Sequence, residues 1–357
     1  MIPPWTLRPN VPLDGLNTFG LRVIAPWLLD LHNVHYTAAA LADARRTGLP
    51  FLPLGSGSNV LFVGDPRACI VRVHPRATTI LAEQQDHVIV RVGAGLDWHG
   101  CVMWSLQHGL VGLENLALIP GTVGACAVQN IGAYGVQIDK LIECVETFDC
   151  QGAAFQNLSA QECQFGYRDS LFKRQPDRYL IVAVRFRLPR RQRLTLDYPG
   201  IRDELRLHGV TRACARDVAA AVIRLRLRKL PDPKIVGNAG SFFKNPLISR
   251  IAYAALRHRL PHLPAYPVAD EALVKIPAAG LIEACGWKGR RINDAGISDQ
   301  HALVLVNHGG ASGAALLQLA QTIRADVFSR YGVDLEPEPR LIGATWQTMA
   351  QTTSRTP

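Results

Sequence analysis

Several features that would assign this chain to a particular class of protein are missing from its sequence. The 357 residues contain no apolar run approaching the ~18 residues that a membrane-spanning helix needs, so no membrane insertion is expected. The N-terminus lacks a basic region followed by an apolar stretch, so no secretory signal is expected and the cytoplasm is the expected location. There is no internal repeat and no low-complexity segment, and this length predicts about two or three domains.

The eight cysteines never show the C-x-x-C spacing of zinc and redox sites, so no bound metal is expected. They are interpreted as reduced, mostly buried small side chains, and a nucleophilic role for one of them is a weaker alternative. The P-loop pattern G-x-x-x-x-G-K-[ST] is also missing. The run Gly55-Ser56-Gly57-Ser58-Asn59 lacks the third glycine and the following helix of a dinucleotide fingerprint.

Positive charge is abundant: the net charge is +10 and the pI about 9.4. Between Arg185 and Lys229 there are twelve Arg and one Lys against four acids. Such an excess is typical of proteins that bind nucleic acid, an acidic membrane surface or a polyanionic small substrate. Because no Cys/His finger and no aromatic-rich strand pattern accompanies it, we expect no nucleic-acid partner. Most of these arginines are interpreted as a solvated helix face.

Two glycine-rich segments could bind a cofactor. The 55–59 loop lies between predicted strands at 51–54 and 60–63, and its backbone N–H groups and hydroxyls could hold phosphate oxygens. The alternative is an ordinary Gly/Ser hairpin. The run from Gly112 to Gly135 has almost no charge, which suits close packing against a large flat group such as a flavin and its pyrophosphate. The alternative is a tightly packed turn of the core.

Two further segments could carry chemistry. Residues 237–246 place Ser241 among glycines, with Phe242-Phe243 and an amide following, which suits a hydroxyl held at a reacting atom. The alternative is a turn between two strands with a buried Phe pair. Arg168 lies between aromatics and a turn, so it could clamp a carboxylate, or it could form an ordinary surface pair with Asp169.

Periodicity and capping residues predict the main elements. Helices are expected at 36–48 with Thr37 as N-cap, at 97–108 with Asp97 as N-cap, and at 218–229, 247–260, 278–285 and 312–331. Strands are expected at 88–92, 143–149, 180–188, 302–306 and, as a final edge strand, 335–343. The proline cluster at 231–234 predicts a domain junction.

These segments occur in a familiar order. The runs at 55–61, 112–135, 165–172, 229–246 and 336–343 together closely resemble the UDP-N-acetylenolpyruvoylglucosamine reductases, the MurB family, over residues 17–343. The intact Gln129–Gly135 run and Tyr198 resemble its type I branch. The resemblance implies an α+β fold: a vanillyl-alcohol-oxidase (PCMH-type) FAD-binding fold of two subdomains, 1–70 and 71–228, and a separate α+β substrate-binding domain, 229–335. A C-terminal strand and tail, 336–357, would contribute to the active site.

The resemblance also implies a reaction in peptidoglycan synthesis. NADPH reduces non-covalently bound FAD, hydride passes from flavin N5 to C3 of UDP-N-acetylglucosamine enolpyruvate, and a proton added at C2 gives UDP-N-acetylmuramate. By motif match Ser241 is the general acid, Arg168 binds the oxyanion and Glu338, as a protonated carboxyl, donates to it. Charge that develops as an enolate needs cations and donors placed in advance, and an acid to complete the reaction.

The remaining binding residues follow from the same resemblance. FAD is expected along Gly55, Ser56, Gly57, Ser58, Asn59, Gly121, Thr122, Gly124, Asn130, Gly132, Ala133 and Tyr134. The substrate is expected to contact Tyr198, Lys229, Asn245, Lys288, His301 and Arg340. A monomer is expected.

Two departures from the family pattern are noted. Cys126 and Ala127 stand where many relatives have Ala or Ser and then Pro, which could loosen the loop near the flavin. His301 stands where some members carry Gln, and it could instead be a satisfied histidine with no ligand contact. Two other functions compete with the reductase: a flavin oxidase or dehydrogenase of the same fold with another substrate, and a non-enzymatic nucleic-acid binder.

Overall fold

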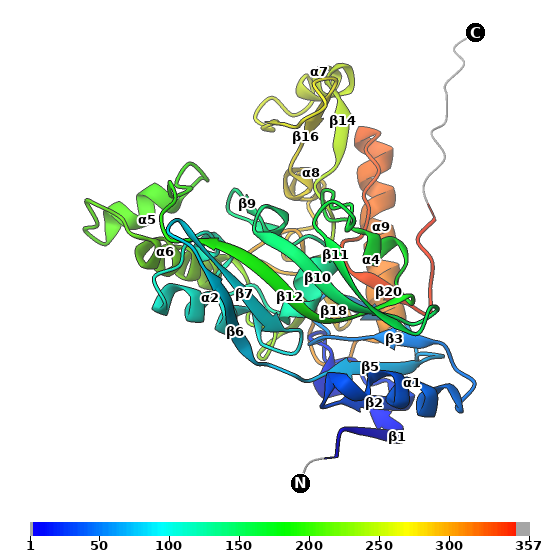
Figure 1. The fold of residues 1–357 in the computed structure, drawn as a ribbon. Helices are drawn as coiled ribbons and strands as arrows, with labels where there is room; N and C mark the ends of the chain where they lie inside the picture. The colour runs from blue at the N-terminus through cyan, green and yellow to red at the C-terminus, as the bar shows by residue number, and fades with distance from the viewer. Residues whose placement is uncertain (1–2, 348–357) are drawn as a thin grey trace. The chain divides into compact units, whose positions relative to one another are not determined.

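The computed structural model describes residues 3–347, and Figure 1 traces the chain through its helices and strands. Two compact units are formed. The first comprises Met1–Leu16, Ile24–Ser58 and Pro66–Lys229, and the second comprises Asn17–Val23, Asn59–Asp65 and Leu230–Pro357. Two short segments from early in the sequence therefore belong to the second unit. The division at residues 70, 228 and 335 that we expect from the sequence stays a prediction.

One sheet of the first unit has four strands in the order β1-β2-β5-β3. These strands are β1 (Trp5–Pro12), β2 (Ile24–Leu31), β5 (Cys69–Val73) and β3 (Phe51–Pro53). β1 is antiparallel to β2, whereas β5 is parallel to β2 and to β3. Helix α1 (Thr37–Arg45) contributes Ala40, Leu41 and Ala44 to a core shared with Leu29 and Val71 of this sheet.

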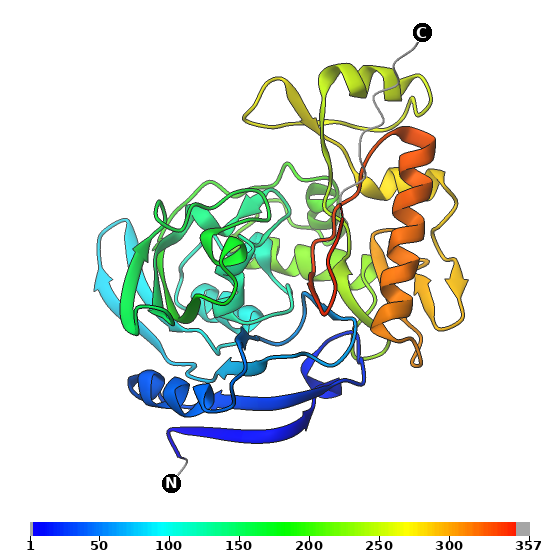
Figure 2. The same cartoon turned by 90° about the vertical axis from the view of Figure 1, so that its right-hand side faces the viewer.

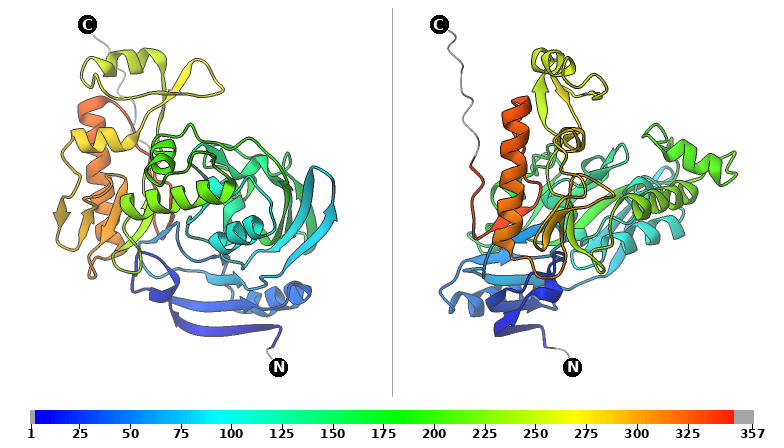
Figure 3. Two further views of the ribbon diagram at one scale, coloured as in Figure 1. Left: turned by 90° about the vertical axis from the view of Figure 1, so that its left-hand side faces the viewer. Right: turned by 180° about the vertical axis from the view of Figure 1, so that it is seen from behind.

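The other sheet of this unit is antiparallel, in the order β11-β10-β12-β7-β6. Its strands are β11 (Ala154–Ser159), β10 (Ile142–Asp149), β12 (Tyr179–Pro189), β7 (His87–Gly93) and β6 (Thr78–Glu83). Its core is completed by α2 (Trp98–Gln107), α3 (Val123–Val128), α5 (Ile201–Leu207) and α6 (Ala215–Lys229). Helices α5 and α6 pack against each other (Figure 3). The short α4 (Leu171–Arg174) contacts α3.

The second unit is built around the sheet β13-β19-β18-β17. Its strands are β13 (Gly237–Ser241), β19 (Val304–Asn307), β18 (Ala295–Ile297) and β17 (Arg291–Ile292). The long helix α9 (Gly313–Tyr331) lies against β18 and β19, with α8 (Ala278–Ala284) beside it (Figure 2). A three-stranded sheet of β14 (Leu247–Ser249), β16 (Leu273–Lys275) and β15 (Tyr266–Pro267) carries α7 (Arg250–Arg257). Finally, β20 (Arg340–Ile342) pairs in parallel with β4 (Val60–Phe62).

Helix ends follow the capping residues in most cases. The Asp97 carboxylate accepts from Gly100 N at 2.9 Å at the start of α2, so the predicted cap is confirmed. At α9 the Ser312 hydroxyl accepts from Ala315 N, and Gly332 ends the helix with a φ of 68°. Thr37 is not an N-cap as predicted, because it is already helical and its hydroxyl donates to Val34 O.

The helix predicted over 247–260 is wrong in its first turn. Residues 247–249 instead form β14, because they pair with β16, and Ser249 then caps α7 through Ala252 N at 3.1 Å. Three helices, α3, α4 and α5, had no prediction. Within the described residues, none of the helices has the length and apolar character required to span a bilayer.

Candidate active site

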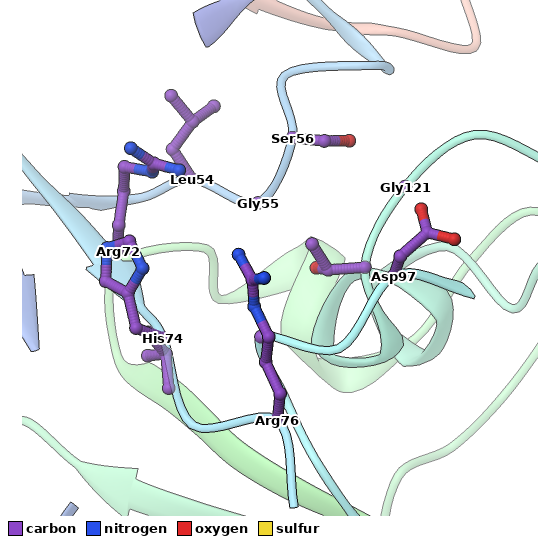
Figure 4. A pocket seen from close by; sticks show the side chains of 11 residues that line it. Leu54, Gly55, Ser56, Arg72, His74, Arg76, Asp97 and Gly121 are labelled. Carbon is purple, nitrogen blue, oxygen red and sulfur yellow. The ribbon is translucent and has the colours of Figure 1, made fainter. Parts of the chain in front are cut away.

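A cavity of about 220 Å³ lies in the first unit, beside the glycine loop (Figure 4). Its lining comes from four separate segments of the chain: Leu54, Gly55, Ser56, Arg72, Val73, His74, Arg76, Gly95, Asp97, Gly121 and Thr122. Four of the twelve residues that the sequence assigns to the cofactor therefore line it: Gly55, Ser56, Gly121 and Thr122.

The backbone at this cavity is shaped for close approach. An added Cβ on Gly55 would come within 2.8 Å of the Thr122 hydroxyl, so any other residue there would force Thr122 to move. Gly57 and Gly121 have φ angles of 67° and 140°, which other residues rarely adopt. The Ser58 hydroxyl donates to Pro120 O at 3.1 Å and joins the two loops. This exposed turn of backbone suits the diphosphate of FAD.

The other residues assigned to the cofactor have contacts within the protein. Gly124 allows α3 to approach β7, because an added Cβ would lie 2.8 Å from the Ala94 Cβ. The buried Asn130 side chain donates to Gly166 O at 3.0 Å and accepts from Asp139 N at 3.1 Å. Tyr134 directly follows the small strand β8 (Gly132–Ala133). Its ring meets that of Tyr198 edge-on, with 4.9 Å between the ring centres. Their cofactor role stays a prediction.

Arg168 is held in a fixed position. Its φ is 55°, its Nη2 donates to Gly132 O at 2.6 Å, and its guanidinium lies 5.4 Å from the centre of the Tyr167 ring. Asp169, the alternative partner, forms an ion pair with Arg174. The turn ends at Ser170, whose hydroxyl donates to Val128 O and caps α4. The left-handed backbone conformation of Arg168 is uncommon for an arginine, and such conformations cluster at functional sites.

Ser241 is the last residue of β13, just after an irregularity in the pairing with β19. Gly240 produces this irregularity with a φ of 68°, and its N–H donates to Asn238 Oδ1 at 2.9 Å. Phe242 and Phe243, which directly follow Ser241, are buried. Within residues 3–347 the Ser241 hydroxyl makes no hydrogen bond, so it is available to a ligand.

Glu338 lies beside this strand in the second unit. Glu338 N donates to Phe242 O at 2.7 Å, and Phe243 and Pro337 form an antiparallel bridge. The amide of Asn59 donates to Glu338 O at 3.3 Å, and Asn59 O accepts from Arg340 N at 3.0 Å. The structure therefore brings Ser241 and Glu338 together from segments almost a hundred residues apart, which no spacing in the sequence could show.

Several residues assigned to the substrate have partners of their own. Asn245 Oδ1 accepts from Ala278 N at 3.0 Å, at the start of α8. Lys288 forms an ion pair with Glu283 at 3.1 Å, and His301 Nδ1 accepts from Leu303 N at 3.2 Å. Lys229 ends α6 and is exposed. These contacts leave the substrate roles as predictions.

The sequence assigns Arg226 no role apart from its place in the predicted helix 218–229. Arg226 Nε donates to Leu118 O at 3.1 Å, and burial lowers the pKa of its guanidinium while nearby Tyr134 raises it. The helical spacing could have indicated that Arg226 is buried, because it lies four residues after the buried Val222 on the same helix face. The cavity residues Arg72, His74 and Arg76 were also missed, because they follow a strand with no recognisable motif.

The cysteines agree with the sequence interpretation: all eight are free thiols, and Cys214 is the exposed one. Cys126 is packed inside α3, and burial raises the pKa of its thiol well above the usual value. Burial likewise raises the pKa of Cys101 to about 12. Such thiols are poor nucleophiles, since the thiolate is the reactive form.

Comparison with known proteins agrees with both units. The profile of the "FAD binding domain" family matches residues 29–156, and that of "UDP-N-acetylenolpyruvoylglucosamine reductase, C-terminal domain" matches residues 232–342. A protein of that reductase name from Xanthomonas euvesicatoria pv. vesicatoria (strain 85-10) is 56% identical over 342 residues, 96% of this chain and 98% of the relative. One from Xylella fastidiosa (strain M12) is 55% identical over 346 residues, with the same shares.

Among solved structures, that of MurB from Thermus caldophilus matches with a TM-score of 0.64 and 25% identity, covering 94% of this chain and 99% of the other. The predicted fold class and the predicted cofactor FAD are thereby confirmed. The matches extend over nearly the whole chain and include an enzyme's cofactor domain and its specific C-terminal domain. The chain therefore belongs to the UDP-N-acetylenolpyruvoylglucosamine reductase (MurB) family of FAD-dependent oxidoreductases.

Proposed function

We propose that this enzyme reduces the enolpyruvyl group of UDP-N-acetylglucosamine enolpyruvate to give UDP-N-acetylmuramate, with NADPH as the reductant, in cytoplasmic peptidoglycan precursor synthesis. The name of the relatives supports the substrate, and the net charge of +10 suits two polyanionic ligands. The observation that carries the proposal is the pairing of the Ser241 and Glu338 segments through the Phe243–Pro337 bridge. A monomer suffices for this reaction and is part of the proposal.

FAD, when bound, transfers reducing equivalents from NADPH to the double bond of the substrate. The residues of the chain must then supply a proton at C2 and stabilise the negative charge that develops there. We assign the proton to the Ser241 hydroxyl, which the Gly240 irregularity presents at the end of β13. A serine hydroxyl is a weak acid, so it can serve only because an enolate is a strong base.

Glu338 and Arg168 are assigned to the substrate carboxylate. A protonated Glu338 would donate a hydrogen bond to the enolate oxygen. Its backbone position is fixed by the hydrogen bond from Glu338 N to Phe242 O. Arg168, in the first unit, would add a cation that Gly132 O holds in place. Preorganised donors of this kind stabilise a transition state more than a ground state. The motif match assigns Arg168 to the same substrate.

The substrate-binding assignments extend this proposal. Tyr198, Lys229 and Lys288 suit a diphosphate, since two are cations and the third is a phenol. Asn245 and His301 offer polar atoms besides those used within the protein, and Arg340 lies on β20 two residues after Glu338. Lys288 is bound to Glu283 only through an exposed ion pair, which costs little to break.

The test is an anaerobic experiment with the two half-reactions separated, using Ser241→Ala. We expect NADPH to bleach the flavin at the normal rate, because no proton donor is needed there. Return of the flavin colour on adding substrate should slow about 10²- to 10⁴-fold, the usual contribution of a general acid. Stopped-flow absorbance measures both steps.

Ser329→Ala, at an exposed position on α9, is the matched control and should leave both half-reactions unchanged. Normal reoxidation of Ser241→Ala by substrate would remove Ser241 as the acid. Failure of the unsubstituted enzyme to reoxidise with this substrate would instead favour a flavin oxidase or dehydrogenase of the same fold acting on another compound.

A further inference from the structure

The segment that follows β5 forms one wall of the cofactor cavity, and the fold holds it rigidly. His74 N donates to Leu31 O at 2.9 Å, and Pro75 O accepts from Gly95 N at 2.9 Å. The opposing strand end can approach because an added Cβ on Gly95 would lie 2.7 Å from the carbonyl carbon of His74. The side chains of His74 and Arg76 therefore start from a fixed backbone (Figure 4).

The buried carboxylate of Asp30, on strand β2, contacts the side chains of this wall. Asp30 is only 5% exposed, and its oxygens lie 2.6 Å from His74 Nε2, 2.7 Å from Arg8 Nη2 and 3.7 Å from Arg72 Nη1. Burial alone would raise the pKa of Asp30, but the hydrogen bonds from His74 and Arg8 lower it overall. Asp30 is thus a carboxylate that fixes the imidazole of His74 and leaves its second nitrogen for other partners.

Arg76 differs from the other arginines near it. Along the chain as the structure describes it, Arg76 forms no ion pair and no hydrogen bond, and Figure 4 shows its side chain extending toward the turn at Gly55. Asp97 is the acidic residue in the cavity lining, and it caps α2 through Gly100 N. The wall therefore presents an unneutralised cation opposite the exposed backbone of the glycine loop.

We propose that Arg76, together with the His74 imidazole positioned by Asp30, binds the diphosphate in the ADP half of FAD. A guanidinium offers a planar fork of donors that matches phosphate oxygens. The glycine loop supplies backbone N–H groups from the opposite side of the same cavity. Asp30, His74 and Arg76 lie within the 29–156 match to the FAD-binding domain, and none of these three belongs to the motifs that carry the family resemblance.

The experiment measures FAD binding to the full-length apoprotein by the quenching of flavin fluorescence. Arg76→Gln should weaken FAD binding about 10- to 100-fold, the effect of losing charged hydrogen bonds. Riboflavin, which has no phosphate, should bind equally to the variant and the parent. Arg46→Gln removes the same charge from an 84% exposed side chain outside the cavity and should leave both constants unchanged.

Unchanged FAD affinity in Arg76→Gln would overturn the proposal, and so would an equal loss of riboflavin affinity. The role of Asp30 is tested by a double-mutant cycle. Asp30→Asn should weaken FAD binding in the parent but have no further effect in His74→Ala, because Asp30 acts through the imidazole. Additive effects on FAD affinity would contradict that positioning role. These readouts concern cofactor binding alone, so they do not depend on the proposed substrate.

Discussion

Gly55 occupies a point where the absence of a side chain has a measurable consequence. Its backbone passes the Thr122 hydroxyl so closely that an added Cβ would lie 2.8 Å from that oxygen and 3.4 Å from the Ala125 Cβ. The sequence predicts this loop because two glycines and two serines alternate there, but it does not show which loop lies opposite. The opposing loop comes from the Gly121 region, sixty residues later, and only the fold places it there.

Gly55→Ala should therefore destabilise the first unit by about 1–3 kcal/mol, the usual effect of overpacking, and should weaken FAD binding. Urea unfolding and fluorescence titration with FAD measure the two effects. The double variant Gly55→Ala/Thr122→Ala also lacks the Thr122 hydroxyl, so its stability and its FAD affinity should both recover in part. Gly15→Ala, where an added Cβ meets nothing within 4 Å, is the control. Native stability and affinity in Gly55→Ala would show that the loops separate without cost.

At the same scale, the sequence identifies Ser241, Glu338 and Arg168 only through their motifs. What it could not supply is the irregularity at Gly240, the bridge that brings Pro337 to Phe243, and the positive φ of Arg168. These features arise from contacts between distant segments, and local sequence carries no record of such contacts. His74 and Arg76 were missed for the same reason, because only the folded structure shows that they line the cavity.

Among the elements, prediction succeeded where the signal was local. Helix α2 has its Asp97 cap and α9 its Ser312 and Gly332 ends, and both were expected close to their observed bounds. Helix α3 was missed because its sequence is rich in glycine and alanine and carries little periodicity; packing against β12 and α2 stabilises it. Residues 247–249 were assigned to a helix, but pairing with β16 overrides their helical pattern.

The pair of helices α5 and α6 depends on one buried carboxylate. Glu204 of α5 is 2% exposed and receives hydrogen bonds from Arg228, from Arg224 Nε at 2.7 Å and from His208 Nε2 at 3.2 Å. The hydrogen bond from Arg228 is the largest cause that lowers the pKa of Glu204 to about 2, against the opposing effect of burial. Arginines that the sequence assigned to a solvated face thus connect two helices.

Because the folded-state pKa lies below the usual value of about 4.5, Glu204 stabilises the protein at neutral pH. This contribution is lost as the pH falls from about 4.5 toward 2. Glu204→Gln should lower the free energy of unfolding at pH 7 by roughly 1–3 kcal/mol, discounted because the Arg228 side chain is half exposed. The difference between variant and parent should shrink at pH 3.

Denaturant unfolding at both pH values checks this expectation. Asp203→Asn, which breaks an exposed pair with Arg206 on the same helix, should change stability by at most ~0.5 kcal/mol. A Glu204→Gln effect that is the same at pH 3 and pH 7 would mean that the carboxylate's charge is not what stabilises the helix pair.

At the scale of the whole molecule, the net charge affects the attraction of ligands more than any single arginine does. Much of the basic stretch 185–229 is neutralised locally, as in the pairs of Arg185 with Glu146, Arg187 with Glu143 and Arg202 with Asp197. The net charge of +10 nevertheless gives the protein a long-range positive field. That field would attract any polyanion, so it favours the proposed substrate and NADPH without distinguishing between them.

Salt should therefore slow the encounter with both ligands, while the chemistry inside the site is screened much less. Raising the ionic strength from ~0.05 to ~0.5 M should lower kcat/KM for the substrate and for NADPH about three- to tenfold, with kcat nearly unchanged. Steady-state kinetics in KCl and in choline chloride measure this, and the same result in both salts separates screening from a specific effect of potassium. Reoxidation of the reduced flavin by dioxygen, a neutral molecule, is the control and should not respond. A kcat/KM independent of ionic strength would show that the excess of arginine and lysine serves folding and pairing inside the protein rather than ligand capture.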